Sequence, residues 1–251
     1  QEECVAHYCA FWRRGISVDV IDSSACSFSC YRLVVIPMLY MLKAGVAEKI
    51  RAYVMGGGTV VATYLTGLVD DSDLCVLGGV PGGLVDVFGA SAEYTDTVTD
   101  CERQAISYRG KRYPVTHYAD AIRMTGAEAV ARYCVEPLAR APAVTRNRFG
   151  RGVAHYLAPR AGDGFLDAFY GDLCSEIGIK PCVSWKIPRG VSVVRRRAEG
   201  RDVFFALNFG AAPTRMKIGK GYIDALADTA APGTVTLGQY GFAVFTDDHG
   251  Q

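Results

Sequence analysis

The spacing of apolar and polar positions predicts an α/β layer in the first part of the chain. Apolar residues recur at helical spacing over 5–12, while 16–21 alternates like a strand. The continuous apolar run at 33–37 is typical of a strand buried in a parallel sheet. A helical stripe over 46–54 is followed by a second buried strand at 59–64. The order helix, strand, strand, helix, strand favours an open, mostly parallel sheet with flanking helices and right-handed crossovers.

The middle of the chain is less regular. Residues 66–83 are rich in Gly and Asp and predict a loop, and a short helix at 84–88 follows it. The stretch 129–135 suits either a helix opened by a capping box or a strand, and its tyrosine and valine content favours the strand. Asp163 is a good N-cap for a helix with a regular aromatic and aliphatic face, which ends at Gly178.

The character of the sequence changes after Pro181. Short apolar runs separated by Gly and Pro continue to the end, and no helical stripe remains. The pattern predicts a small antiparallel β-domain. We therefore expect a first domain over 1–183 and a second over 184–251, with a linker at 181–188. The predicted strands are 191–194, 203–207, 216–218, 235–237 and 242–245.

Composition excludes several classes of protein. Half of the 251 residues are apolar, and the net charge of +1 gives no basic surface for nucleic acid or an anionic membrane. No apolar run approaches the roughly 18 residues that span a bilayer. The nine cysteines are odd in number and irregularly spaced, which favours reduced thiols in the cytoplasm over a disulfide framework. We expect no metal and no cofactor.

The residues that could catalyse a reaction form no convincing set. A nucleophile on an α/β sheet needs a sharp turn after a strand, but the turn at 63–67 has neither Cys nor Ser. His117 and His155 therefore have no nucleophile to activate. An independent amidotransferase-like hydrolase remains an alternative, and its least unsuitable thiols are Cys75 and Cys101.

The glycine-rich loop offers no better case for chemistry. Its carboxylates Asp70, Asp71 and Asp73 are more typical of turn capping than of the carboxylate pair of a glycosidase. Its second half, 78–83, lacks the Lys-Ser/Thr ending of a phosphate-binding loop. The sequence thus predicts no catalytic residue in this chain.

Several stretches together resemble the β-galactosidases of glycoside hydrolase family forty-two. The resemblance covers nearly the whole chain, and the loop at 67–82 is its most specific part. The matching stretches are 12–20, 31–40, 57–64, 67–73, 77–82, 142–152, 154–156, 205–209 and 239–245.

The resemblance implies a domain order of catalytic (β/α)₈ barrel, amidotransferase-like trimerisation domain and small β-domain. This sequence holds the last two, and the first strand of the trimerisation domain is expected to be missing. The acid/base Glu of the family follows an Asn, but here Asn147 and Asn208 precede Arg148 and Phe209. We therefore expect a non-catalytic assembly region whose partners are itself, as a homotrimer, and the barrel. The residues expected to face the barrel or an interface are Asp70, Asp71, Asp73, Gly78, Gly79, Pro81 and Gly82.

A third hypothesis treats the terminal β-domain as a carbohydrate-binding module. Its only tryptophan is Trp185 in the linker, and the sequence shows no row of aromatic residues for sugar stacking. The sequence therefore gives this reading little support.

Overall fold

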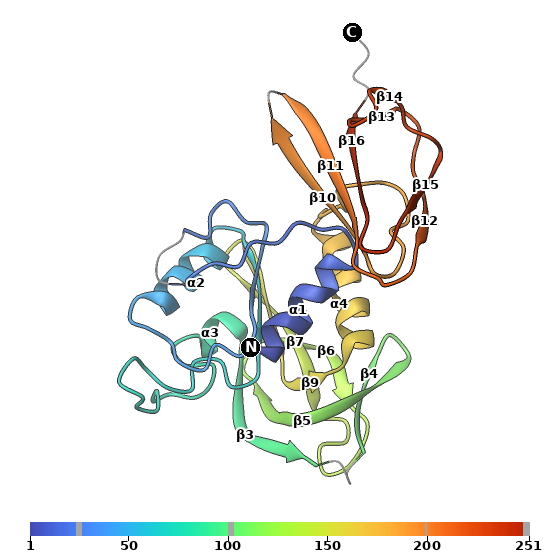
Figure 1. Cartoon of the computed structure of the whole chain (residues 1–251). Coiled ribbons are helices and arrows are strands. Elements are labelled where there is room, and N and C mark those ends of the chain that lie inside the picture. Colours follow the sequence, from blue (N-terminus) through green and yellow to red (C-terminus); the bar gives the residue numbers. More distant parts are fainter. Residues whose placement is uncertain (24–26, 100–102, 199, 248–251) are drawn as a thin grey trace. The chain divides into compact units, whose positions relative to one another are not determined.

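The computed structural model describes residues 1–23, 27–99, 103–198 and 200–247. The chain forms two compact units (Figure 1). Unit 1 comprises Gln1–His7 and Val20–Phe169, and unit 2 comprises Tyr8–Asp19 and Tyr170–Gln251. Among the described residues, no helix is long and apolar enough to cross a membrane.

Unit 1 is built on a nine-stranded mixed sheet in the order β1-β2-β8-β7-β6-β4-β5-β3, with β9 beside β5. Among the described strands of this sheet, β1, β2 and β8 alone are parallel to their neighbours in the order β1-β2-β8. The other pairs are antiparallel. The predicted sheet with flanking helices is confirmed, and so is the strand at 129–135. The sheet is mixed, however, and not mostly parallel as predicted, because most strands after β3 return by short turns, and not by helices, which makes neighbours antiparallel. The strands are β1 (Leu33–Ile36), β2 (Thr59–Thr63), β3 (Ala90–Val98), β4 (Gln104–Tyr108), β5 (Lys111–Met124), β6 (Glu128–Tyr133), β7 (Pro142–Phe149), β8 (Gly152–Leu157) and β9 (Pro159–Ala161).

The described residues also form four helices: α1 (Glu2–Trp12), α2 (Val46–Met55), α3 (Val85–Phe88) and α4 (Asp163–Glu176). The predicted stripe of α2 is confirmed, since Val46, Ile50 and Val54 are all buried. The first half of α4 packs in unit 1 through stacked Phe165 and Phe169. Tyr108 of β4 meets the edges of both rings, with centroid distances of 5.6 and 6.3 Å.

Of two local predictions near the N-terminus, one is confirmed and one is wrong. The helix predicted over 5–12 is α1, although Val5 and Tyr8 are exposed and its buried residues include the polar Glu3 and His7, which pair at 3.2 Å. The alternating segment 16–21 forms no strand, since none of the described strands pairs with it. Alternation alone does not make a strand, because the backbone also needs a partner for its hydrogen bonds.

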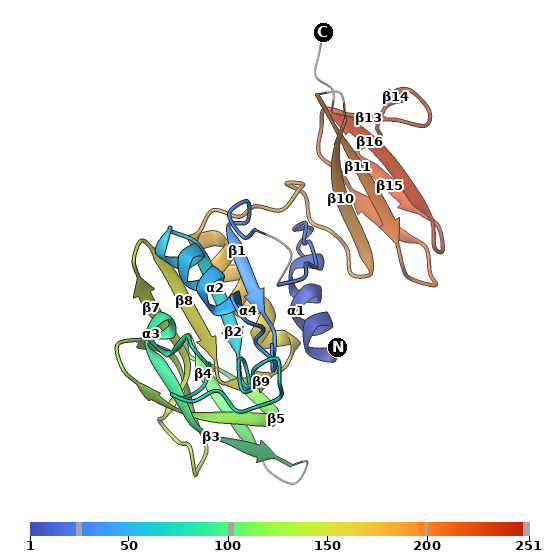
Figure 2. The ribbon, with the colours of Figure 1, turned by 90° about the vertical axis from the view of Figure 1, so that its left-hand side faces the viewer.

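Unit 2 contains the predicted antiparallel β-domain. Its five-stranded sheet has the order β10-β11-β16-β13-β14, and β12 pairs with β15 (Figure 2). The core between these strands includes Val193, Phe204, Met216, Leu237 and Phe245. The strands are β10 (Val191–Ala198), β11 (Arg201–Asn208), β12 (Thr214–Lys217), β13 (Tyr222–Asp224), β14 (Thr229–Ala230), β15 (Thr234–Leu237) and β16 (Phe242–Asp247).

Candidate functional site

The carboxyl ends of the parallel strands are where an open α/β sheet usually places its ligand or nucleophile. Strand β2 ends there in a sharp turn, and Leu65 adopts a left-handed backbone conformation with φ of 57°. Such strain is typical of a nucleophile elbow, but a half-buried leucine has no nucleophilic atom. This turn therefore cannot supply the nucleophile of a covalent reaction.

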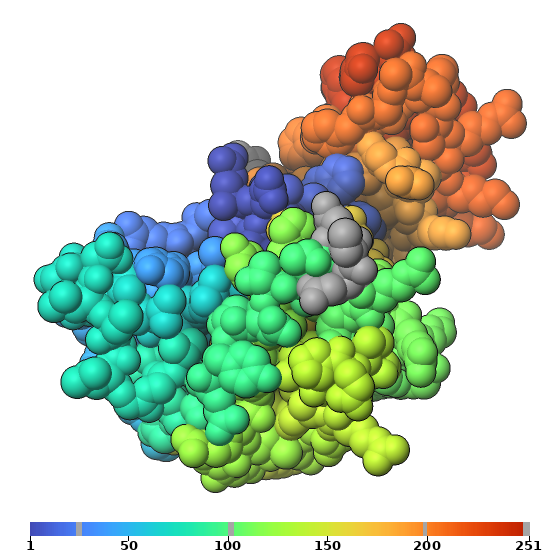
Figure 3. All heavy atoms as spheres, turned by 90° about the horizontal axis from the view of Figure 1, so that it is seen from below, coloured from blue at the N-terminus to red at the C-terminus, as the bar shows by residue number. Residues whose placement is uncertain are grey.

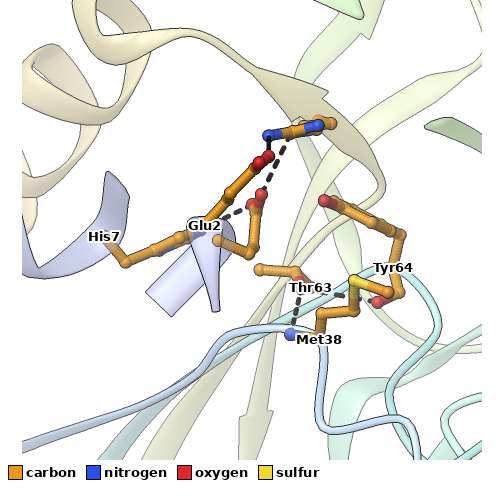
Figure 4. Close-up of polar contacts among 7 residues, drawn as sticks. Glu2, His7, Met38, Thr63 and Tyr64 are labelled. Atoms are coloured by element: carbon orange, nitrogen blue, oxygen red, sulfur yellow. Dashed lines mark hydrogen bonds and ion pairs between the residues drawn. The ribbon is translucent and has the colours of Figure 1, made fainter. Parts of the chain in front are cut away.

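A network of charged and polar side chains lies beside this turn (Figure 4). Glu3 accepts a hydrogen bond from His7 and forms an ion pair with Arg160, whose Nε is 3.2 Å from the carboxylate. Arg160 also pairs with Glu2 at 3.0 Å. Although burial would raise the pKa of Glu3, its contacts with His7, Tyr64 and Arg160 hold that pKa below its usual value. These groups satisfy one another, so the network anchors the first turn of α1 to the sheet.

We expect Arg160→Met to lower the free energy of unfolding by about 2–3 kcal/mol, since it removes the permanently charged partner of the buried Glu3 carboxylate. Urea unfolding at pH 7 measures the loss. The matched control is Arg123→Met, because Arg123 and its partner Glu93 are both largely exposed and 3.8 Å apart. An equal loss in both variants would contradict an anchoring role for the Glu3 network.

The loop between β2 and α3 contains all seven residues that the sequence analysis assigned to a barrel-facing or interface site. Asp70 builds the loop: its Oδ1 accepts hydrogen bonds from the backbone N–H groups of Ser72 and Leu74, at 2.8 and 3.1 Å. Asp71 and Asp73 are exposed, and Asp73 has a left-handed backbone with φ of 59°. Asp70 is thus a turn-capping residue, while the other two carboxylates face solvent.

The glycines and proline of the loop close its base. The N–H of Gly82 donates to the carbonyl of Gly67 at 3.1 Å, and the peptide bond before the buried Pro81 is cis. Gly78 and Gly79 both have φ near 100°, a conformation that L side chains rarely adopt. The structure therefore brings Gly67 and Gly82 together and places 71–78 at the exposed tip.

Gly82→Ala is expected to destabilise the loop base, because the added Cβ would lie 2.3 Å from the carbonyl oxygen of Gly67. We expect a loss of about 2 kcal/mol in the free energy of unfolding. Limited proteolysis should then cut at 71–78 faster than in the unaltered chain. Gly233→Ala is the control, since its Cβ would meet nothing within 4 Å and its φ is not positive. Equal proteolysis of both variants would contradict this packing.

Exposed apolar side chains at the loop tip were missed by the sequence analysis, which singled out the Asp and Gly residues. Leu77 is 92% exposed and Leu74 is 64% exposed. Tyr40 and Met41 are also exposed, and Met41 forms a bridge with Val69 at the start of the loop. We call Tyr40, Met41, Leu74 and Leu77 the loop patch; the segment that carries the two leucines is teal on the surface in Figure 3. Grouped exposed apolar residues are typical of an interaction site.

A second group missed by the sequence analysis is buried in the sheet. Asp120 of β5 is fully buried and accepts hydrogen bonds from the hydroxyls of Tyr156, at 2.6 Å, and Thr95, at 2.7 Å. Burial raises its pKa to about 6 despite these two bonds. His155 is also buried, and burial together with the charge of Arg146 lowers its pKa to about 4. His155 was named in the sequence analysis but Asp120 was not, and only the tertiary structure shows that both side chains are buried.

The remaining candidates do not assemble into a site. Cys75 is exposed in the loop, and Cys101 lies outside the described residues. His117 is on β5 with a left-handed backbone. In the described part of the chain, no three His, Cys, Asp or Glu side chains are grouped so as to hold a metal ion.

Comparison with protein families identifies both parts of the chain. Residues 1–180 match the family described as "Beta-galactosidase trimerisation domain", and 190–247 match "Beta-galactosidase C-terminal domain". Among curated proteins, the chain is 39% identical over 218 residues to beta-galactosidase Pbg of Clostridium perfringens, covering 84% of this chain and 31% of Pbg. It is 34% identical over 252 residues to beta-galactosidase BglY of Alicyclobacillus acidocaldarius, covering 97% and 36%.

Solved structures agree. A catalytic mutant of Gan42B, a GH42 beta-galactosidase from G. stearothermophilus, superposes with a TM-score of 0.93 at 34% identity, covering 98% of this chain and 36% of that one. A beta-galactosidase from Rahnella sp. R3 gives a TM-score of 0.89 at 35% identity, covering 96% and 36%. The chain thus spans about a third of the length of these relatives.

Proposed function

Because the chain belongs to the glycoside hydrolase family 42 β-galactosidases, as their trimerisation and C-terminal domains, we propose that it joins three copies of such an enzyme around a threefold axis. The match of residues 1–180 to the trimerisation domain carries this proposal. Hydrolysis of terminal β-galactosides would then take place in a barrel domain outside these 251 residues. The leucine at the strained turn after β2 supports a non-catalytic role for the sheet.

We also propose a domain boundary, a fold type for unit 1 and a cellular location. We place the boundary between 183 and 184, in the irregular segment between α4 and β10, and we regard the sheet of unit 1 as amidotransferase-like. Strand β1 lies at the edge of that sheet, where a further strand preceding α1 would pair. A cytoplasmic location is supported by the seven described cysteines, all of which are free.

We assign the contact with the barrel or with a second copy to the loop at 67–83. Its exposed leucines offer apolar area, and the turn capped by Asp70 together with the Gly67–Gly82 contact fixes their backbone. A preorganised loop loses little conformational entropy on binding. Both properties suit a surface that is buried in an assembly.

The solution mass of the chain, measured by light scattering after size-exclusion chromatography, tests the proposal. We expect three times 27.1 kDa. The same sample should hydrolyse a nitrophenyl β-galactoside no faster than buffer, since neither Asn147 nor Asn208 is followed by the Glu that the family uses as its acid/base residue. A monomer would contradict intrinsic trimerisation, and measurable hydrolysis would contradict the non-catalytic role.

A further inference from the structure

Arg51 of helix α2 holds the end of the loop at 67–83. One arm of its guanidinium donates to the carbonyl of Gly83 at 2.7 Å, and the other donates to the carboxylate of Asp86 in α3. The loop ends at Gly83 and α3 begins at Val85, so one side chain binds both sides of this junction. Helices α2 and α3 lie next to each other in Figure 1. Arg51 thus joins α2 to the loop and to the helix that follows it.

The shape of this junction suits an arginine. Gly83 has a left-handed backbone with φ of 66°, and a Cβ added to it would lie 3.4 Å from the Cβ of Ala47. The end of the loop therefore packs closely against the first turn of α2. A planar guanidinium reaches two acceptors at once with separate N–H groups, whereas the ammonium of a lysine is a single point of charge. The two acceptors of Arg51 use that fork.

Two further contacts restrict the side chain of Arg51. Partial burial would raise the pKa of Asp86, but the hydrogen bond and the charge of Arg51 hold that pKa below its usual value, so the carboxylate is ionised at neutral pH. The guanidinium also lies over the ring of Phe149 in β7, with its Cζ 5.8 Å from the ring centroid. The ring and the carboxylate together fix the direction in which Arg51 donates to the loop.

Backbone hydrogen bonds hold the two halves of the loop at other points. In the incoming half, the N–H of Gly67 donates to the carbonyl of Leu39 at 2.8 Å. In the outgoing half, the carbonyl of Val80 accepts from the N–H of Ala92 at 2.8 Å. Arg51 adds a charged side-chain contact at the last residue of the outgoing half. That contact ties the loop end to α2, which neither of these backbone bonds does.

The exposure of the pair decides where its effect is expected. The side chains of Arg51 and Asp86 are 35% and 56% exposed, and an exposed ion pair contributes little to the free energy of unfolding of a whole domain. A surface loop opens locally, however, without unfolding the rest of the structure. A loop that has opened must be ordered again before it binds, and this entropy cost lowers affinity. The expected effect of the pair is therefore on the order of the loop.

We propose that Arg51 is the positioning residue of the loop at 67–83 and that it fixes the loop patch for contact with a second copy of the chain. This inference rests on the proposed function, in which the loop lies at a contact of the trimer. A second copy is the partner that fits the match of residues 1–180 to a trimerisation domain. Leu74 and Leu77 supply the apolar contact, while Arg51 acts on the backbone that carries them.

Hydrogen exchange and solution mass of the Arg51→Met chain test the proposal. The amide of Gly82, which donates to Gly67, should exchange about tenfold faster, while the amide of Val153 in β8 and the midpoint of urea unfolding stay unchanged. Light scattering over a concentration series should show that the trimer dissociates at an about tenfold higher concentration. Arg51→Lys should restore neither value, because it keeps the charge but not the fork. Circular dichroism confirms that each variant is folded.

Arg151→Met is the matched control, since Arg151 donates to the carbonyl of Gly56 at the end of the same helix and should affect neither measurement. Unchanged exchange of Gly82 in the Arg51 variant, or equal acceleration in the control, would overturn the proposal. So would faster exchange with unchanged dissociation, since the positioned loop would then not join copies. The two proposals fail separately. A monomeric unaltered chain contradicts intrinsic trimerisation, and exchange of Gly82 still decides whether Arg51 positions the loop; a trimer with unchanged exchange contradicts only the role of Arg51.

Discussion

Replacing both Leu74 and Leu77 with aspartate is expected to reduce the solution mass of the chain from that of the proposed trimer, three times 27.1 kDa, to 27.1 kDa. Both leucines are largely exposed at the loop tip, so the folded monomer should tolerate the change. Burying one leucine at an interface contributes about 1.5–3 kcal/mol. With aspartate in place of leucine, the interface loses that contribution, and burying the carboxylate adds the cost of removing a charge from water. We expect the affinity between two copies to fall on the order of a thousandfold at each interface of the trimer.

Light scattering over a concentration series measures this effect. Leu226→Asp is the matched control, since it also places a charge on an exposed leucine, but in unit 2, and its mass should stay that of the unaltered chain. Asp71→Ala tests whether the exposed carboxylate contributes, and we expect a smaller effect because an exposed charge contributes little. If the doubly substituted chain remains a trimer, the loop patch does not join the copies.

Asp120→Asn is expected to raise the free energy of unfolding at pH 7 to 8 by up to about 2 kcal/mol. The folded pKa of Asp120, about 6, lies above its ordinary value of 3.8. A group with a raised folded pKa contributes stability below the unfolded pKa and loses it as the pH rises through the folded pKa. Full ionisation thus costs roughly 3 kcal/mol, of which imperfect hydrogen bonding by asparagine offsets a part.

The contribution of His155 to the free energy of unfolding has the opposite pH dependence. Its pKa is lowered from 6.5 to about 4, so its stabilising effect is complete above pH 6.5 and is lost as the pH falls. In the unaltered chain the two residues oppose each other between pH 4 and 6.5. Of these two opposing contributions, the Asp120 variant retains only the loss due to His155, so its stability should fall more steeply in acid than that of the unaltered chain.

Urea unfolding between pH 4 and 8 separates these contributions. The advantage of the Asp120 variant should shrink from pH 7 to pH 4 and vanish where the aspartic acid is protonated. Ser107→Ala in β4, which involves no titratable group, should show the same difference from the unaltered chain at each pH. A constant advantage for the Asp120 variant would mean that Asp120 does not titrate in this range.

The sequence by itself determined the four helices, strands β1, β2 and β6, the separate β-domain and the absence of a nucleophile at 63–67, but not the other strands of the large sheet. Helix and strand periods are local properties, and a missing Cys or Ser needs no coordinates. The ordered stretches also sufficed to identify the family, as the matches over 1–180 and 190–247 confirm.

Tertiary structure alone decided the antiparallel pairing of most of the sheet, the polar face that α1 buries, and the burial of Asp120 among Tyr156 and Thr95. It also decided that Leu77 is exposed and that Phe209 and Tyr240 lie on adjoining loops, although they are far apart in the sequence. The physical reason is the same throughout. Burial and pairing depend on which distant segment supplies the partner, and the local order of residues does not contain that information.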